Sequence, residues 1–172
     1  AFMLQPATGY IRITRFAEKT GEELSQALAN LKDRGMSRLL LDLRGNGGGL
    51  LSQAVEVADH FVEKGELIVY TQGRDSALHE EHKARLALQD EPLALLVLLN
   101  HGSASASEIV AGAVQDLDLG LIVGQTSFGK GLVQQQFRLS DGGVLLLTVA
   151  RYYTPLGRLI QRPYTEDIQA YI

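Results

Sequence analysis

The 172-residue chain, with 45% apolar and 21% charged residues, is long enough for one compact domain with a buried core. Its formal net charge of −4 gives no sign of a basic surface for nucleic acid, and no apolar run approaches the roughly 18 residues of a membrane span. Cysteine is absent, which excludes disulfide bonds and thiol nucleophiles but leaves the redox compartment undetermined.

The first half of the chain predicts two strands that are each followed by a helix. Gly9 to Phe16 alternates apolar and polar residues like a strand, and Thr20 with Glu23 forms a capping-box pattern at the start of a helix. Leu39 to Leu43 is a short apolar strand, and apolar residues recur at helical spacing from Leu51 to Gly65, after a glycine cluster.

The second half continues this alternation as far as residue 123. Leu67 to Tyr70, Leu93 to Leu99 and Leu121 to Val123 predict further buried strands, and Ile109 to Val114 lies in a predicted helix. Between the first two of these strands, Gly73 to Glu91 carries dense charge, which is typical of an exposed loop or a surface helix.

The last third predicts a β-hairpin instead of another strand and helix. Val133 to Leu139 and Val144 to Tyr153 flank an Asp-Gly-Gly turn. The fold class is therefore α/β with an added antiparallel element, and the lack of internal repeats and low-complexity linkers predicts a single domain over residues 1–172. Because the chain starts at Ala1 without an initiator Met or a signal segment, we expect a fragment of a longer chain.

A glycine-rich turn follows the strand at Leu39 to Leu43. Asp42 to Gly49 reads DLRGNGGG, in which the glycines free the backbone to turn sharply and to direct N–H groups at a bound anion. This geometry suits an oxyanion hole. A dinucleotide-binding turn would need glycine where Leu50 stands, and an ordinary structural turn is the other interpretation.

A serine-rich segment, NHGSASAS at Asn100 to Ser107, joins the apolar strand to the helix that contains Ile109. A serine there lies near the positive end of the helix dipole, where a neighbouring backbone N–H can stabilise the oxyanion formed on nucleophilic attack. Taken alone, however, the segment favours an ordinary serine N-cap over catalysis.

A lysine between glycines occupies the third segment, GQTSFGKG at Gly124 to Gly131. The segment approaches the P-loop pattern, but Gly131 replaces the metal-binding hydroxyl residue, and a strand-like stretch follows where a P-loop requires a helix. Burial between the glycines and Phe128 would lower the pKa of Lys130 and let it accept a proton from a serine. The other interpretation is a solvated surface lysine.

The histidines give a competing hypothesis of a catalytic triad, because His60 follows Asp59 and His101 lies in the serine-rich segment. Neither occurs in a recognisable triad context. His79 and His82 are predicted to be surface residues rather than metal ligands, and we expect no metal or other cofactor.

Together these three segments, with LSDGG and LTVARYYTPLGR further along, resemble the carboxyl-terminal processing (tail-specific) serine peptidases in order and spacing. The resemblance spans roughly residues 9–163. It implies a crotonase-like α/β fold and the cleavage of protein substrates near their C-terminus, through an acyl-enzyme formed with a Ser/Lys pair.

The resemblance also assigns roles to individual residues. It implies that Ser105, the middle serine of SASAS, is the nucleophile and that Lys130 is the base, with Gln134 holding the lysine amine. Ala106 and Gly48 would supply the N–H groups of the oxyanion hole. The acidic residues near the site could equally belong to a solvated helix face. Residues with a supporting role would be Gly47, Glu108, Asp116 and Ser127.

Two departures from the family pattern matter. Ser127 replaces the usual threonine, and the PDZ domain that normally precedes the first strand and captures the substrate's tail is not among these residues. The implied partners are protein or peptide substrates with accessible C-termini and the PDZ domain of the full-length chain, and a homo-oligomer is also compatible. An exported, periplasmic or cell-envelope location is implied by the resemblance alone.

A ligand-binding module is the rival function, because relatives of this fold include retinoid-binding repeats in which ligand capture replaces proteolysis. The retention of both Ser105 and Lys130 argues against a pure binding role.

Overall fold

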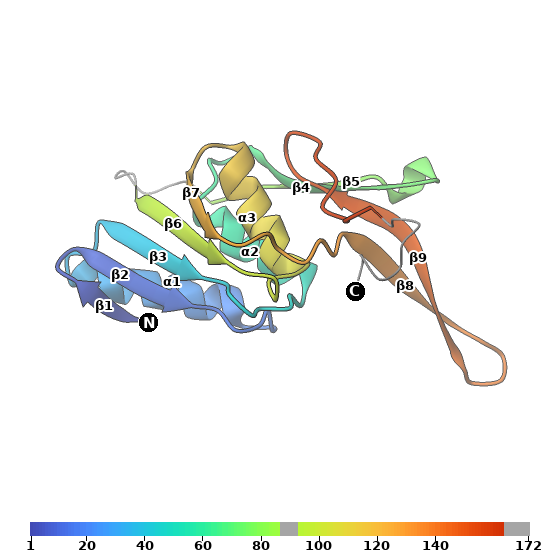
Figure 1. Cartoon of the computed structure of the whole chain (residues 1–172). Helices are drawn as coiled ribbons and strands as arrows, with labels where there is room; N and C mark the ends of the chain where they lie inside the picture. Colours follow the sequence, from blue (N-terminus) through green and yellow to red (C-terminus); the bar gives the residue numbers. More distant parts are fainter. Residues whose placement is uncertain (87–92, 164–172) are drawn as a thin grey trace.

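Two β-sheets and three α-helices make up the computed structural model, which describes residues 1–86 and 93–163 (Figure 1). The larger sheet has five strands in the order β1-β2-β3-β6-β7, and the smaller has four in the order β5-β4-β9-β8. No helix in these two ranges is long and apolar enough to cross a membrane. In chain order the elements are β1 (Phe2–Gln5), β2 (Thr8–Arg12), α1 (Thr20–Asp33), β3 (Arg38–Asp42), α2 (Leu51–Asp59), β4 (Leu67–Gly73), the 3-10 helix η1 (Ser76–Leu78), β5 (Glu80–Lys83), β6 (Ala94–Leu99), α3 (Ala106–Asp116), β7 (Gly120–Gly124), β8 (Leu132–Arg138) and β9 (Val144–Tyr153).

The five-stranded sheet is parallel except at one edge. β2, β3, β6 and β7 run in the same direction, whereas β1 pairs antiparallel with β2. The register places Leu41 between Ile11 and Val97, and these buried side chains form a row on one face of the sheet. The side chains of this row are apolar because a packed layer covers this face of the sheet.

The three α-helices form one layer against the face that carries this row. α2 contacts both α1 and α3, while α1 contacts β2 and α3 contacts β7. Leu24, Leu28 and Leu31 recur at helical spacing and are the buried leucines of α1. The layer leaves the carboxyl ends of β3, β6 and β7 side by side at one edge of the sheet (Figure 1).

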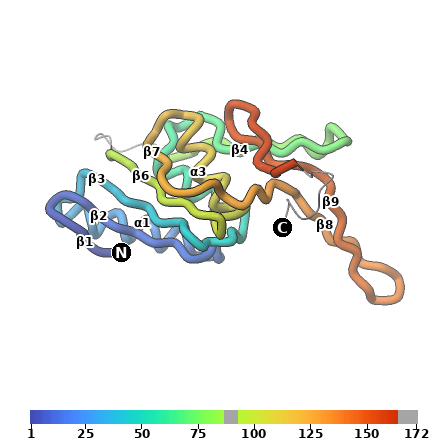
Figure 2. The backbone as a smooth tube through the Cα atoms, in the orientation of Figure 1, coloured from blue at the N-terminus to red at the C-terminus, as the bar shows by residue number. Residues whose placement is uncertain are grey.

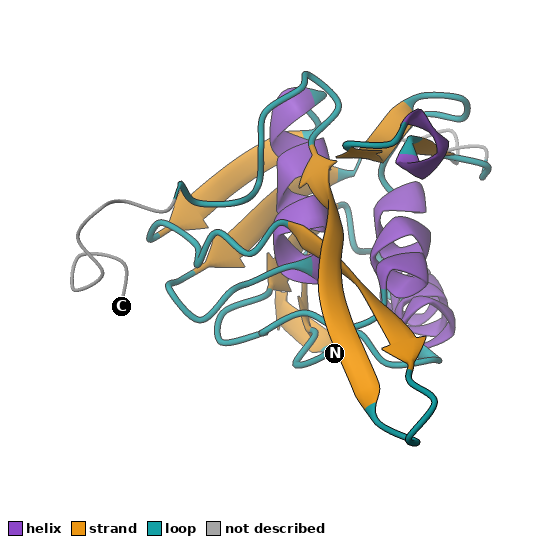
Figure 3. Cartoon of the chain, turned by 90° about the vertical axis from the view of Figure 1, so that its right-hand side faces the viewer, coloured by secondary structure: helices purple, strands orange, loops and turns teal. Residues whose placement is uncertain are grey.

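A long hairpin dominates the smaller sheet. β8 and β9 pair antiparallel, with Gln136 opposite Leu146, and β9 then continues alongside β4. Tyr70 of β4 stacks on Tyr153 of β9, with ring centroids 5.1 Å apart. Figure 2 shows the hairpin projecting from the body, and in Figure 3 it lies nearest the viewer. Because β8 begins directly after Gly131, the hairpin starts at the lysine-containing segment.

Most of the predicted helices and strands are confirmed, with five differences. β7 is not the buried strand predicted at Leu121 to Val123, because Leu121 is 67% and Val123 44% exposed. The helix predicted as far as Gly65 ends at Asp59.

Thr20 is the first residue of α1 and Lys19 is the N-cap, which has no side-chain hydrogen bond, so the predicted capping box is wrong. The charged segment after Gly73 contains β5, an edge strand whose charged side chains suit its position. Residues 87–91 of the predicted segment, Gly73 to Glu91, lie outside the described ranges. β2 also ends earlier than predicted, at Arg12.

Candidate active site

The three candidate segments meet at one edge of the five-stranded sheet. Each follows one of three neighbouring parallel strands, β3, β6 and β7, whose carboxyl ends lie together. The Ala104 N–H donates to the Asn46 carbonyl at 3.0 Å, and the Phe128 N–H donates to the Ser103 carbonyl at 2.9 Å. We call the segments the glycine turn (residues 44–49), the serine segment (residues 100–107) and the lysine loop (residues 124–131).

The three serines of the serine segment have different surroundings. Ser103 and Ser107 are fully buried, and their hydroxyl groups donate at 2.9 Å to the carbonyls of Leu43 and Asn46, respectively. Ser105 is half-buried and is the N-cap of α3. Its φ of 55° lies in the left-handed region, which residues other than glycine seldom adopt and which recurs at functional sites. Ser105 is therefore set apart from two structural serines.

Glu108 connects the serine segment to the lysine loop. Its side chain lies in the first turn of α3, and the residue is only 6% exposed. Oε2 accepts the N–H groups of Ser105 and Lys130, both at 2.8 Å. Oε1 accepts the Gly129 N–H at 2.6 Å and the Ser127 hydroxyl at 2.7 Å. A solvated helix face is therefore the wrong interpretation of Glu108, because four protein donors take the place of water.

The lysine side chain itself remains in solvent. Lys130 and Gln134 are both exposed, and Phe128 is 53% exposed. The predicted burial of the lysine by Phe128 is therefore wrong. Within the described ranges, no hydrogen bond joins the Ser105 hydroxyl to the Lys130 amine, or that amine to Gln134. The backbone of the lysine loop is thus held beside the serine while its amine is not yet engaged.

Gly48 lies against the start of α3. Its φ is 99°, and a Cβ at this position would lie 2.8 Å from the Ser105 Cβ and 3.0 Å from the Ala106 nitrogen, so only glycine fits. The Gly48 N–H donates to Asn46 Oδ1 at 2.9 Å. The Ala106 N–H, in contrast, has no acceptor among the residues that the structure describes. Gly47 belongs to the same turn, with open space around it.

A buried aspartate, Asp42, lies beside the glycine turn, and the sequence interpretation gives it no role. Asp42 ends β3 and is fully buried; it accepts the Tyr10 hydroxyl at 2.6 Å and the Arg44 guanidinium at 2.7 and 2.9 Å. The Arg44 guanidinium is the main reason that the pKa of Asp42 lies well below its usual range, and Tyr10 also lowers it, against the effect of burial. The signal in the sequence is an aspartate inside an apolar run.

Replacing Asp42 with asparagine is expected to lower the free energy of unfolding by about 2 kcal/mol at pH 7, because Arg44 and Tyr10 lose a carboxylate partner. A carboxyl group whose pKa is lowered by folding stabilises the protein above its unfolded pKa of about 4. That contribution is lost as the pH falls toward the folded pKa, so the difference between wild type and variant should shrink at acidic pH. Urea unfolding of both proteins at pH 7 and pH 3 measures this difference in the free energy of unfolding. An equal difference at both pH values would contradict the lowered pKa of Asp42.

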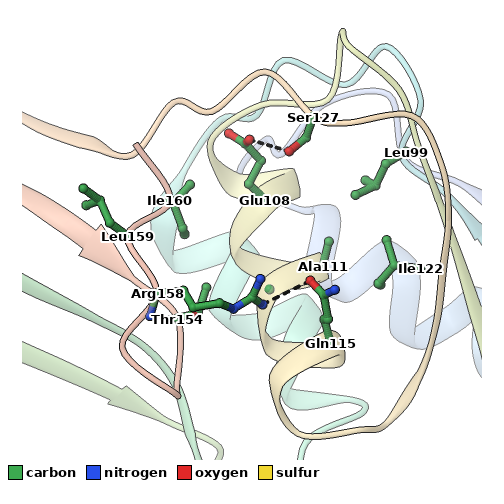
Figure 4. Close-up of a pocket in the computed structure, with 11 residues that line it drawn as sticks. Leu99, Glu108, Ala111, Gln115, Ile122, Ser127, Thr154, Arg158, Leu159 and Ile160 are labelled. Carbon is green, nitrogen blue, oxygen red and sulfur yellow. Dashed lines mark hydrogen bonds between the residues drawn. The ribbon is translucent and has the colours of Figure 1, made fainter. Parts of the chain in front are cut away.

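A small hollow runs along α3 beside the lysine loop (Figure 4). Its volume is about 170 Å³, below the roughly 300 Å³ of typical small-molecule sites, so it can accept a side chain rather than a cofactor. Glu108 and Ser127 lie at one end, and Arg158, which donates to Gln115 at 3.1 Å, lies at the other. The walls between them are mainly apolar and include Leu99, Ala111, Ile122, Leu159 and Ile160.

Asp116 does not join the site. It is the last residue of α3, about 16 Å along the helix from Ser105. Its carboxylate accepts the Leu156 N–H at 2.9 Å and the Arg158 guanidinium. Burial raises the pKa of Asp116, but hydrogen bonds from Thr154, Leu156 and Arg158 outweigh burial and lower the pKa overall. Asp116 therefore fixes the turn after β9, and the printed partners of its carboxylate belong to that turn rather than to the serine segment or the lysine loop.

Among the described residues, no histidine side chain is hydrogen-bonded to Ser105. Asp59 accepts two backbone N–H groups of the segment after β5, and burial lowers the pKa of its half-buried neighbour His60. His101 is exposed, and His79 and His82 lie beside glutamates of β5. No group of three or more histidine, aspartate or glutamate side chains in these ranges could hold a metal ion.

An α/β domain with a serine at a helix N-terminus beside a glycine turn is an arrangement typical of serine hydrolases. Sequence comparison identifies the family. The profile described as Peptidase family S41 matches residues 7–170, and the chain belongs to this family.

Individual relatives agree with the family. The carboxy-terminal-processing protease of Bartonella bacilliformis is 46% identical over 157 residues, which are 89% of this chain and 36% of that protein. The chloroplastic C-terminal processing peptidase of Tetradesmus obliquus is 42% identical over 149 residues, 87% of this chain and 32% of the relative. The solved structure of the photosystem II D1 C-terminal processing protease has a TM-score of 0.82 and 41% identity, covering 90% of this chain and 39% of the other. The chain thus spans about a third of the length of the two sequence relatives.

Proposed function

We propose that this chain is the catalytic domain of a carboxyl-terminal processing serine peptidase, with Ser105 as the nucleophile and Lys130 as the general base. The observation that carries the proposal is the Glu108 carboxylate, of which one oxygen accepts the N–H groups of both Ser105 and Lys130. Two amides that share one acceptor oxygen are close neighbours, so the lysine side chain begins beside the nucleophile. Membership of Peptidase family S41 supports the same reaction class.

In the proposed reaction, the Ser105 hydroxyl oxygen attacks the carbonyl carbon of the scissile peptide bond while the neutral amine of Lys130 takes the hydroxyl proton. The tetrahedral intermediate then expels the amine of the leaving peptide, which receives that proton from Lys130. Water, deprotonated in turn by Lys130, hydrolyses the acyl-enzyme and regenerates Ser105. Gln134 follows the lysine loop on β8 and would hold the amine by a hydrogen bond.

The exposed lysine side chain has to turn toward Ser105 before this reaction can begin. Its backbone is fixed by Glu108, so the movement involves the side chain alone. A bound substrate would exclude water from the amine and favour its neutral form, which is the form that accepts a proton. Substrate binding would therefore complete the catalytic pair.

The developing negative charge of the intermediate requires N–H donors. The Ala106 N–H lies at the positive end of α3, where a helix stabilises an anion. The Gly48 N–H is the proposed second donor, although it now donates to Asn46. Asn46 is itself buried and donates to the Ile13 carbonyl at 2.9 Å, so it holds the turn in place. Sharing of the Gly48 N–H between Asn46 and the oxyanion is thus part of the proposal.

The wider assignments concern the whole protein. We propose a crotonase-like core that carries the hairpin, protein substrates with accessible C-termini, and a PDZ domain in the full-length chain that captures their tails. Of the two sequence relatives, the Tetradesmus obliquus protein is named as chloroplastic and the Bartonella bacilliformis protein is bacterial. An exported, cell-envelope location, and assembly into homo-oligomers, are proposed on the same family basis.

A fluorophosphonate probe tests the nucleophile, because its phosphorus forms a bond to an activated serine oxygen with loss of fluoride. We expect one adduct per chain, and peptide mass mapping should place it on Ser105. Ser52→Ala, which changes an exposed serine of α2, should label like the wild type. An adduct on another serine, or no adduct on a folded chain, would contradict the proposal and favour a ligand-binding role.

A further inference from the structure

One face of the five-stranded sheet is left open. Near-continuous apolar strands such as Leu93 to Leu99 are typical of parallel sheets that are covered on both faces. In β6, however, only alternate residues are buried: Leu95 and Val97 belong to the core beneath the helices, whereas Leu96 is half-exposed on the opposite face. Among the described elements, all three α-helices lie on the first face (Figure 1).

An apolar row crosses this open face from edge to edge. The strand register aligns one residue from each of the five strands, namely Phe2, Tyr10, Leu40, Leu96 and Leu121. The residues at the two ends are the most exposed, with Phe2 at 48% and Leu121 at 67%. None of the five belongs to the core cluster on the helix side. Tyr10, Leu40 and Leu96, which lie between Phe2 and Leu121, are partly exposed. Exposed apolar patches that exceed a few hundred Å² are typical of interaction sites.

Arginines border the apolar row. Arg38 begins β3 and Arg12 ends β2; both are exposed, and the register places both on the open face. Asp42, a carboxylate on the same face, is already bonded to Arg44. The margins are therefore cationic, although the whole chain has a net charge of −4. Two copies of this face would bring like charges together, which disfavours self-association through it.

We propose that the open face is the docking surface for an amphipathic α-helix with acidic side chains beside its apolar stripe, supplied by the full-length polypeptide outside these 172 residues. Helices are the elements that cover parallel sheets in α/β domains. The relatives are about three times as long as the region that matches them, so they contain the length that such a helix needs. The apolar stripe would cover the row, and the carboxylates would pair with Arg12 and Arg38.

Two designed helical peptides of roughly 18 residues test the chemistry of the surface. One carries leucines along one side and glutamates beside them, and the other has lysines in place of the glutamates. Fluorescence anisotropy should show that the glutamate peptide binds the chain at least about tenfold more tightly than the lysine peptide. Leu121→Gln should weaken that binding about tenfold. Leu156→Gln, which changes a leucine 73% exposed in the turn after β9, should not.

Equal binding of the two peptides, or equal effects of the two substitutions, would overturn the proposal. The source is tested in the full-length polypeptide, where Leu121→Gln should lower Tm by about 4 °C or more and Leu156→Gln should leave it unchanged. An unchanged Tm in the Leu121 variant would overturn the intramolecular source. Concentration-dependent dimerisation or binding to anionic vesicles that disappears in this variant would instead assign the face to a second copy or to a membrane.

Discussion

Lys130→Ala is expected to lower the rate of substrate cleavage by at least about 1000-fold while leaving the fold unchanged. Without the amine, the Ser105 hydroxyl has no group to take its proton during attack. The contribution of Lys130 to the folded structure is its backbone N–H bond to Glu108, which alanine retains. The assay uses mass spectrometry to follow the cleavage of an unstructured protein with an apolar C-terminus. It compares wild type and variant, both in this chain and in the full-length protein.

Matched variants separate the base from a general effect of charge. Lys64→Ala removes an exposed lysine from the turn after α2 and should cleave at the wild-type rate. Lys130→Arg keeps the positive charge but provides no neutral form, so it should be as inactive as the alanine variant. Ser105→Ala gives the background rate. Wild-type cleavage by the arginine variant would show that Lys130 is not the base.

Glu108→Ala is expected to abolish cleavage and to lower the free energy of unfolding by about 3 kcal/mol. The substitution leaves the Ser127 hydroxyl and the N–H groups of Ser105, Gly129 and Lys130 without their acceptor. The lysine loop then loses its shared attachment to the nucleophile. Chemical unfolding and the cleavage assay, applied to the same preparation, measure the two losses.

A conservative variant distinguishes positioning from stability alone. Glu108→Gln keeps the size of the side chain but presents an NH₂ group to one pair of donors. We expect a folded protein whose kcat falls about 100-fold with little change in KM, because the placement of the reacting groups changes and the substrate contacts do not. Glu63→Gln, at an exposed glutamate after α2, is the matched control. A wild-type kcat in the Glu108→Gln protein would limit Glu108 to a structural role.

The sequence could locate the candidate site because its chemistry lies in short segments that follow apolar strands. The carboxyl ends of neighbouring parallel strands meet, so the segments had to meet as well. The family resemblance gave Glu108 a supporting role, but its burial and its four hydrogen bonds were not predictable, since a glutamate in the first turn of a helix is usually a solvated capping residue. It becomes buried because the lysine loop folds over the helix start. Phe128 is an example of the opposite error. It lies close to Lys130 in sequence, but its side chain is exposed and does not bury the lysine.

The fold followed the apolar pattern wherever that pattern was strong. β5, with the sequence EEHK, was missed because an edge strand needs backbone pairing on one side only and carries no apolar alternation. Leu93 to Leu99 predicted a strand correctly, but its continuous apolar character indicated burial on both faces. The described structure buries one of them. The hydrophobic pattern of a strand predicts which of its faces are buried, but it does not predict which segment packs against each face.

The glycine turn reads as a run of similar residues, yet its members tolerate change to very different degrees. A side chain at Gly49 would place its Cβ 2.0 Å from the Phe16 carbonyl oxygen, and one at Gly48 would collide with Ser105. Gly47 has an ordinary φ and nothing within 4 Å of the position that a Cβ would occupy. Steric clashes therefore exclude any side chain at Gly48 and Gly49, whereas the turn can accept another residue at Gly47.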